Sequence, residues 1–296
     1  MKIDSRRSRM GQDDRWLGQA AEAWENDVER TAYYVVRESE SPDARPANSR
    51  FPDGDSKSEP TGVKICGRCG RPMSLVAVLE LSDATELAIR GTPRVTVQIC
   101  PDPECRSDLA SALAGRWATF IYRFCGTQEY GDAVTAWLSV IAEPARHHEP
   151  VEAGSRGWLL EPAPDIIDPT DYSWYPGEPW SHAQAVLSQI DDRVQRQRVC
   201  QRLVGRRSRW HDPKFGGYPH WRSIQVNGGC ECSMRGTPVF TFSPSLCPSL
   251  CAPGTSAWLL MCKEYGLEHT GAVVFQATPI EAQLKGLIPG DGMFAL

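Results

Sequence analysis

Two runs of β-forming residues, at positions 75–81 and 94–99, are the clearest elements in the pattern of apolar and polar positions. Both runs are rich in Val, Leu and Ile, and a short segment separates them. Runs of this kind and length are typical of strands, so we expect them to form the two arms of a long hairpin. A short helix is expected over 108–116, a strand over 117–124, and either a helix or a strand over 132–141.

Helical spacing of apolar residues occurs in two further segments. In residues 13–37 apolar side chains recur at steps of three and four, which predicts an amphipathic helix. The polar and basic residues 1–12 that precede it are expected to form a flexible tail. Residues 181–210 contain the best predicted helix, with Ser181 as its N-cap and a broken apolar stripe along one face.

Composition divides the chain into four regions. Residues 1–61 join the first predicted helix to a flexible linker, at 38–61, that is rich in Ser, Pro, Asp and Gly. Residues 62–142 form the hairpin module. Residues 143–180 are acidic, proline-rich and aromatic, which excludes long helices and predicts a loop region. Residues 181–296 combine a basic helix with a cysteine-containing β module. These regions together predict an α+β fold that is rich in β-structure.

Four cysteines flank the predicted hairpin, Cys66 and Cys69 before its first arm and Cys100 and Cys105 after its second. Folding the hairpin brings the two pairs together, and two close thiolate pairs are typical ligands of a structural zinc ion. The segment contains no His, which favours a closed site of four thiolates over a catalytic zinc. The alternatives are reduced buried cysteines or a redox role for the first pair, and the presence of a second pair argues against both.

A second group of cysteines, Cys230, Cys232, Cys247 and Cys251, gives a weaker signal. These residues can form a second metal site. The spacing of the first two, Cys-x-Cys, is less usual for a ligand pair than Cys-x2-Cys. We therefore favour the alternative interpretation, in which these residues are buried thiols or form local disulfides.

The composition indicates a protein with free thiols and a small net charge. Eleven cysteines are an odd number, and their grouping in close pairs fits metal ligation better than a disulfide framework. The formal net charge of −5 gives no global signal for a nucleic-acid or membrane partner. No apolar secretory segment and no apolar run approaching ~18 residues is visible. These observations predict a cytoplasmic protein without a membrane span.

The segment that begins at Gly216-Gly217-Tyr218 predicts a tight turn, because glycine tolerates positive φ and the following proline fixes the exit. The turn lacks the Gly-Lys-Ser/Thr that a phosphate-binding loop requires. Gly216, Gly217, Tyr218 and Trp221 are candidates for contact with a partner, and packing of the aromatic side chains in the core is the alternative.

Seven arginines and no acidic residue lie within positions 193–209. A solvated basic helix face is the simplest interpretation. The functional alternative is contact of Arg202, Arg206 and Arg207 with RNA phosphates or with an acidic partner. An intramolecular match to the acidic residues 143–180 explains the arginines equally well.

The cysteine hairpin resembles the zinc-ribbon segment of the programmed-cell-death-protein-2-like proteins. Members of that family typically read Cys-x-x-Cys, a proline, an apolar strand, and then a strand that ends in Cys-Pro-x-x-x-Cys. The corresponding positions here are Cys66, Cys69, Pro72, 75–79, Cys100, Pro101 and Cys105. In addition, the glycine turn at 214–225 is similar to a turn of those proteins and of the YwqG-like family, and the ending Gly-Asp-Gly-Met-Phe-Ala-Leu resembles the YwqG-like family.

What the resemblance implies is a binding role, because the eukaryotic relatives are chaperones for a small-subunit ribosomal protein and use a zinc-stabilised β-rich scaffold. The residues themselves offer no convincing general-base arrangement. We therefore predict a non-enzymatic, zinc-stabilised protein-binding module that acts as a chaperone or adaptor for a ribosomal-type protein. The alternative is a nucleic-acid-associated zinc-ribbon protein that binds RNA through residues 193–209.

Overall fold

The computed structural model of the chain describes residues 4–25, 29–51, 63–84, 87, 89, 94–113, 119–125, 128–129, 137–143, 158–166, 182–204, 209, 212–218, 237–262 and 270–277. Within these ranges strands predominate over helices, and most strands belong to one large antiparallel sheet. The predicted α+β, β-rich class is therefore confirmed. None of the helices in these ranges has both the length and the apolar character that crossing a bilayer requires.

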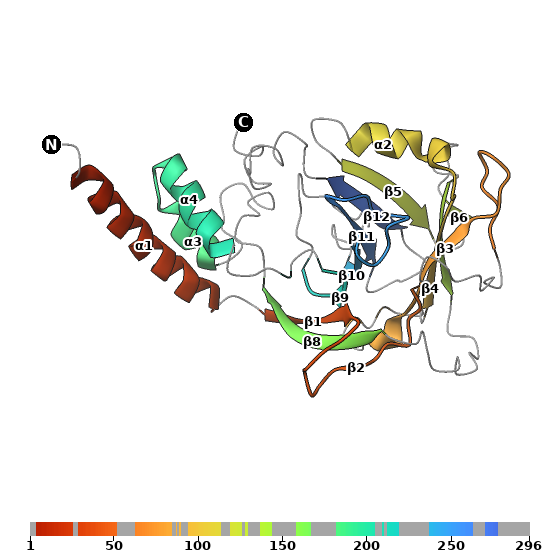
Figure 1. Cartoon of the computed structure of the whole chain (residues 1–296), viewed down its shortest axis with the longest axis horizontal. Coiled ribbons are helices and arrows are strands. Elements are labelled where there is room, and N and C mark those ends of the chain that lie inside the picture. Colours follow the sequence, from red (N-terminus) through yellow and green to blue (C-terminus); the bar gives the residue numbers. More distant parts are fainter. Residues whose placement is uncertain are drawn as a thin grey trace.

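Nine strands form the large sheet, in the order β2-β8-β1-β9-β10-β11-β12-β5-β6 (Figure 1). Each neighbouring pair in this order is antiparallel. The strands are β1 (Glu29–Val36), β2 (Arg45–Pro46), β5 (Thr119–Cys125), β6 (Gln128–Glu129), β8 (Leu159–Ile166), β9 (Lys214–Gly216), β10 (Thr237–Phe242), β11 (Thr255–Met261) and β12 (Thr270–Ala277).

A second sheet consists of β3 (Ser74–Glu80), β4 (Arg94–Ile99) and β7 (Leu138–Glu143), with β4 in the middle. The pair β3–β4 is the hairpin predicted from the sequence, and Ser74 lies opposite Ile99 at its open end. One large apolar cluster contains side chains from both sheets, so the main core lies between them. The last five residues of β4 are all buried, because this strand is covered on both faces.

Two parts of residues 38–51, predicted to be a flexible linker, are instead held in the fold: β2 pairs with β8, and residues 49–50 lie against the outer edge of β3. Arg50 and Val78 exchange two backbone hydrogen bonds, of 2.7 and 2.9 Å. The hydroxyl of Ser49 accepts a hydrogen bond from the backbone N–H of Glu80, at 2.8 Å. The linker prediction is wrong for these residues because the backbone of Arg50 and the hydroxyl of Ser49 satisfy the open strand edge. The rest of the predicted linker, at 52–61, lies outside the described residues.

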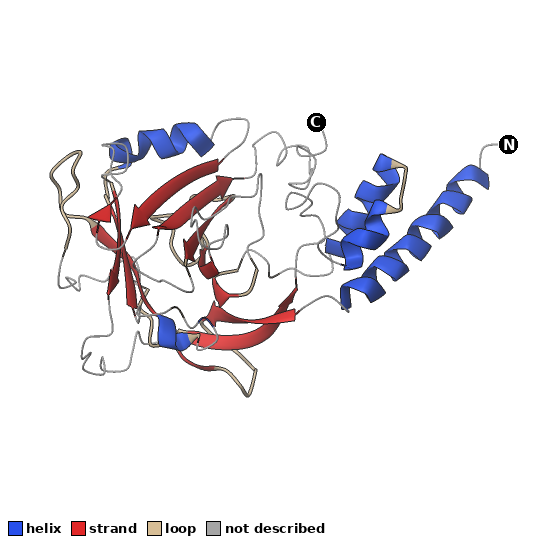
Figure 2. Cartoon of the chain, turned by 180° about the vertical axis from the view of Figure 1, so that it is seen from behind, coloured by secondary structure: helices blue, strands red, loops and turns tan. Residues whose placement is uncertain are grey.

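Three helices pack together at one end of the molecule (Figure 2). They are α1 (Asp4–Glu25), α3 (His182–Ser188) and α4 (Arg193–Val204), whereas the short α2 (Ser107–Leu113) lies at the opposite end. An apolar cluster holds the three together, and among its members are Leu17, Ala20, Trp24, Leu187, Val199 and Leu203. The flexible tail predicted for residues 1–12 is wrong from Asp4 onward, because α1 begins there.

The two long predicted helices are both shorter than expected. The helix predicted for 13–37 ends at Glu25, and the run Thr-Ala-Tyr-Tyr-Val-Val that follows forms most of β1, since β-branched and aromatic residues favour strands. The helix predicted for 181–210 divides into α3 and α4. The carboxylate of Asp192 accepts hydrogen bonds from the backbone N–H groups of Val194 and Gln195, which caps α4 as a separate helix.

The region 143–180 was predicted to be a loop, but it contributes β8 to the large sheet. Pro162 and Pro164 are two residues apart in this strand, so their missing N–H groups lie on the same edge. β8 pairs with β1 along its whole length, whereas β2 pairs only at Leu159 and Leu160. The prolines therefore fit on the side that carries little pairing, and they protect that edge from other strands.

A fully buried ion pair anchors the middle of the large sheet. The ammonium of Lys214 on β9 donates to the carboxylate of Asp165 on β8, at 2.7 Å, and neither side chain is exposed. The same carboxylate accepts the backbone N–H of Tyr218, at 2.7 Å. Gly217 has a φ of +68°, and a Cβ at this position would lie 2.2 Å from the Asp165 oxygen. Only glycine fits at this position, because the carboxylate occupies the space of a side chain.

Replacing the buried carboxylate should destabilise the fold strongly. In Asp165→Asn, Lys214 stays buried without its counter-charge, and loss of one partner of a buried pair costs about 3–5 kcal/mol. Urea denaturation followed by tryptophan fluorescence measures the free energy of unfolding. Arg202→Ala is the matched control, since it removes an exposed pair with Asp14 and should cost about 1 kcal/mol or less. Equal losses in the two variants would contradict this account of the sheet.

Candidate metal centre

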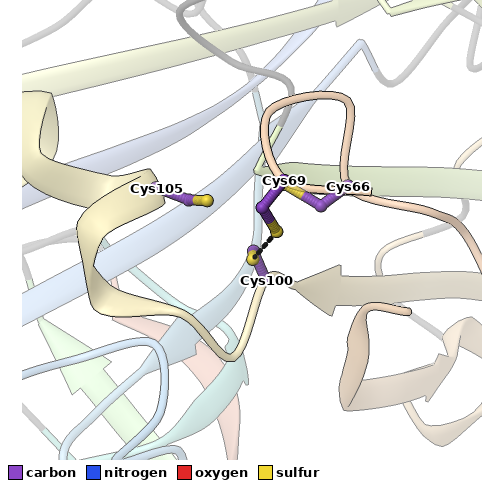
Figure 3. A group of neighbouring side chains, drawn as sticks. All are labelled: Cys66, Cys69, Cys100 and Cys105. Atoms are coloured by element: carbon purple, nitrogen blue, oxygen red, sulfur yellow. Dashed lines mark hydrogen bonds between the residues drawn. The ribbon is translucent and has the colours of Figure 1, made fainter. Parts of the chain in front are cut away.

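The four cysteines that flank the hairpin meet at its open end. Cys66 and Cys69 lie in the turn that precedes β3, and Cys100 follows β4 directly. Cys105 lies in a 3-10 helix, η3 (Pro103–Arg106), which leads into α2. Because β3 and β4 are antiparallel, the residue before one strand and the residue after the other are brought to the same end. Figure 3 shows the four side chains turned toward a common centre.

The spacing of the sulfur atoms fits a single tetrahedral ion. The four Sγ atoms all lie within 4.8 Å of one another, and those of Cys69 and Cys100 are 3.5 Å apart. Zn–S bonds of about 2.3 Å in a tetrahedron place the sulfur atoms about 3.8 Å apart. Within the described residues this is the one group of His, Cys, Asp or Glu side chains close enough to hold a metal. The centre predicted from the sequence is therefore present, and it can bind a metal ion.

The first ligand turn is built by short-range backbone hydrogen bonds. The N–H of Gly70 donates to the carbonyl of Cys66 and the N–H of Cys66 donates to the carbonyl of Arg71, both at 2.9 Å. Gly70 adopts a φ of +72°, which closes the turn at little steric cost. This arrangement points both thiols of the Cys-x2-Cys pair to one side.

The second ligand segment is organised by a helix cap. The carboxylate of Asp102 accepts the backbone N–H of Glu104, at 3.0 Å, and Pro103 occupies the first turn of η3. The N–H of Cys100 donates to the carbonyl of Trp137, at 2.7 Å, which ties the end of β4 to the start of β7. Capping therefore fixes the four-residue spacing that returns Cys105 toward Cys100.

Arg68 and Arg71 join the two ligand segments. The guanidinium of Arg68 donates to the carbonyl of Cys105 at 2.6 Å and forms a two-pronged pair with Asp108, at 3.1 and 3.3 Å. Arg71 pairs with Asp102 at 3.2 Å, but its side chain is 65% exposed. Arg68 thus holds both the ligand residue Cys105 and the helix α2 that follows it, which restrains the geometry of the site. Arg68 is therefore the stronger of the two supports.

The pKa values of the thiols differ within the cluster. Burial disfavours the thiolate of Cys66, but hydrogen bonds from the backbone N–H groups of Cys69 and Arg68 outweigh it and lower its pKa to about 7. Burial raises the pKa of Cys100 and that of Cys105, and hydrogen bonds with the thiols of Cys66 and Cys69 raise both further. One thiol ionises readily, whereas further ionisation is opposed by like charge. A metal cation bound to all four thiolates would remove this repulsion.

The second predicted cysteine group is only partly described. Cys247 and Cys251 are buried in turns between β10 and β11, and the thiol of Cys247 lies 3.9 Å from the carbonyl of Val76. Burial raises the pKa of Cys247, which favours its neutral thiol. Cys230 and Cys232 lie outside the described residues, so the second metal site stays a prediction.

The glycine turn has its contacts inside the protein. Gly216, Gly217 and Tyr218 are buried, and Tyr218 packs against the apolar cluster of the three-helix bundle. The turn thus joins the bundle to the middle of the large sheet, rather than presenting these residues to solvent. Trp221 lies outside the described residues, as do Arg206 and Arg207.

The arginines of α4 are largely engaged within the chain. Arg202 pairs with Asp14 of α1 at 2.8 Å, and Arg198 pairs with Asp13 at 3.2 Å. Beyond the helix, Arg209 pairs with Glu161 of β8. Among these pairs, only that of Arg209 with Glu161 matches the intramolecular pairing with residues 143–180 suggested by the sequence, whereas Arg198 and Arg202 pair with α1 instead. RNA binding by this segment stays a prediction.

Sequence analysis did not identify the supporting residues of the centre. The Asp102-Pro103 pair carried a usable signal, because Asp followed by Pro is typical of a helix start. The pairing of Arg68 with Asp108 joins residues 40 positions apart, and no local pattern indicates it. The buried pair of Lys214 and Asp165 was missed for the same reason.

Comparisons of the chain with protein-family models, with curated proteins and with solved structures found no match. The resemblance of the hairpin to the programmed-cell-death-protein-2-like proteins, and of the glycine turn to the YwqG-like family, therefore stays a prediction. The chemistry of the site follows from its own geometry.

Removing the support of Arg68 should weaken metal binding. Arg68→Ala releases the carbonyl of Cys105 and the carboxylate of Asp108, and loss of such outer contacts typically costs 10- to 100-fold in metal affinity, so we expect a loss of roughly that size. Competition with a chromogenic chelator measures the affinity. Arg71→Ala is the control, because its exposed pair should contribute little. A stronger effect of Arg71→Ala than of Arg68→Ala would contradict the assignment.

Proposed function

We propose that this protein is a non-enzymatic protein-binding module whose β scaffold is stabilised by a zinc ion at Cys66, Cys69, Cys100 and Cys105. The convergence of these four thiols within 4.8 Å carries the proposal. A closed set of four thiolates favours zinc, which is tetrahedral in structural sites and binds soft sulfur ligands well. Four protein ligands leave no open position, so the role of the ion is structural.

Zinc at this position would connect parts of the chain that come from different elements. The ligands belong to the turn before β3, to the end of β4 and to η3, and η3 continues into α2 and then β5 of the large sheet. The ion would thus fix how the hairpin joins that sheet. Because the site does not exist in the unfolded chain, the binding free energy of the metal would add to the stability of the fold.

The surface next to the ion offers a candidate contact for a partner. Ile65 precedes the first ligand, forms a bridge with Pro72, and is 58% exposed. Ligand turns held by a metal are rigid, and a rigid apolar side chain loses little freedom on binding. We propose Ile65 as a partner contact, since Gly216, Gly217 and Tyr218 are buried.

The kind of partner follows from the resemblance and from charge. The formal net charge of −5 suits a basic protein of the ribosomal type. Eight cysteines in the described part of the chain are free thiols, which fits a reducing compartment and a cytoplasmic location. A chaperone or adaptor role for a ribosomal-type protein is consistent with these properties.

Metal analysis tests the structural part of the proposal. Protein purified under reducing conditions should contain one zinc ion per chain, and the double variant Cys66→Ser/Cys69→Ser should lose both the zinc and thermal stability. Cys200→Ser, in the helix bundle, is the control that should keep the zinc. The absence of zinc from the parent protein would refute the metal site. A second zinc ion would indicate that the cysteines at 230–251 form a further site.

Binding measurements test the partner. Purified small-subunit ribosomal proteins are titrated one by one against the zinc-loaded chain by calorimetry. We expect saturable binding to one of them, weakened about 5- to 10-fold by Ile65→Ser. Val194→Ser is the matched control, since Val194 is the other large apolar side chain exposed among the described residues, at 60%. The absence of binding to every protein tested would refute the ribosomal role.

A further inference from the structure

Cys69 differs from the other three ligands in its exposure. Cys66, Cys100 and Cys105 are buried, whereas Cys69 is exposed. Its neighbours at 67–72 in the ligand turn are exposed as well. Cys69 is therefore the ligand residue with the greatest access to a dissolved oxidant, and access is one of the factors that oxidation of a thiol follows.

Cys100 is placed to complete a disulfide with Cys69. Their sulfur atoms are 3.5 Å apart, and a disulfide bond of about 2.05 Å requires an approach of about 1.5 Å. Cys69 lies between Gly67 and Gly70 in the exposed turn, and glycine gives the backbone freedom to make this small shift. Cys100 is fixed at the end of β4, so Cys69 is the residue that moves.

We propose that Cys69 and Cys100 form a hydroperoxide-sensitive pair whose oxidation to a disulfide releases the metal ion. The inference rests on the proposed function, because it requires that zinc is bound. It adds regulation to that function, with a hydroperoxide as the chemical signal.

The reaction balances in two steps. The thiolate of Cys69 attacks the terminal oxygen of the hydroperoxide, which breaks the O–O bond and gives a sulfenic acid and, after protonation, an alcohol or water. The sulfur of Cys100 then attacks the sulfur of Cys69, forms the S–S bond and expels hydroxide, which takes up a proton as water. The two thiols lose two electrons in total, and the hydroperoxide gains them. Thiol reduction reverses the change.

Release of the ion would loosen the partner surface. Cys66 and Cys105 alone are too few ligands for a closed site. The new disulfide would join the two ligand segments at Cys69 and Cys100, but the ion that also holds Cys66 and Cys105 would be lost. Ile65 adjoins Cys66 in the sequence, so it would lose the rigid support that the metal gives to the turn. Oxidation would therefore weaken partner binding.

Peroxide treatment of the zinc-loaded full chain tests this inference. Hydrogen peroxide is added in the presence of a chromogenic zinc chelator, and disulfides are then mapped by mass spectrometry after alkylation of free thiols. We expect release of the zinc together with a Cys69–Cys100 disulfide, and recovery on addition of dithiothreitol and zinc. Retention of zinc in excess peroxide, or a Cys66–Cys69 disulfide in its place, would overturn the proposal. A chain without zinc before treatment would instead refute the metal site itself.

A ligand-preserving variant isolates the role of the exposed thiol. Cys69→His removes that thiol but retains a zinc ligand, since three cysteines and one histidine also form structural zinc sites. We expect this variant to release zinc at least about tenfold more slowly in peroxide, and the control Cys200→Ser to behave as the parent. Equal rates for Cys69→His and the parent would refute the role of Cys69. If Cys69→His binds no zinc, the disulfide map of the parent chain decides.

Discussion

The buried ion pair between Lys214 and Asp165 is the interaction on which the large sheet depends. β9 has three residues, yet within the described strands it alone joins β1 to β10 and so connects the two halves of the sheet. So short a strand gains little from its backbone ladder. The side chain of Lys214 reaches past β1 and binds Asp165 on β8, which gives β9 a contact with a second strand on that side. Burying two charges is costly, and we interpret the pair as fixing the position of β9 rather than adding net stability.

The metal centre poses the opposite electrostatic problem at the open end of the hairpin. Lys214 and Asp165 neutralise each other, whereas the four thiols become like charges as they ionise, and their neighbours raise the pKa values of Cys100 and Cys105. The chain supplies Arg68 to the carbonyl of Cys105 and to Asp108, not to the sulfur atoms. A bound cation would supply the compensating charge if all four thiols ionise together.

The hairpin and its ligands could be predicted because their signals are local. Strand patterns and the spacing of ligand pairs extend over only a few residues. β1 and β8 could not be predicted, since the apolar residues of β1 also fit helical spacing and the prolines of β8 indicate a loop. These two segments form strands because they pair with each other. Such pairing is not visible locally, since contacts like that of Tyr34 with Asp165 join residues 131 positions apart. Asp165 was missed as the partner of Lys214 for a similar reason, since 49 positions separate the two residues.

The arginines of α4 show why charge density alone does not identify a nucleic-acid surface. Arg202 forms an ion pair with Asp14 of α1. Asp14 lies far outside positions 193–209, so the pattern of that segment does not indicate the pair. Each such pair lowers the positive potential that would attract phosphates. Because the glycine turn is also buried, the exposed ligand turn is the better candidate for the surface that contacts a partner. Ile65 and Cys69 lie in that turn, so partner binding, metal binding and thiol oxidation would act on one segment of the chain.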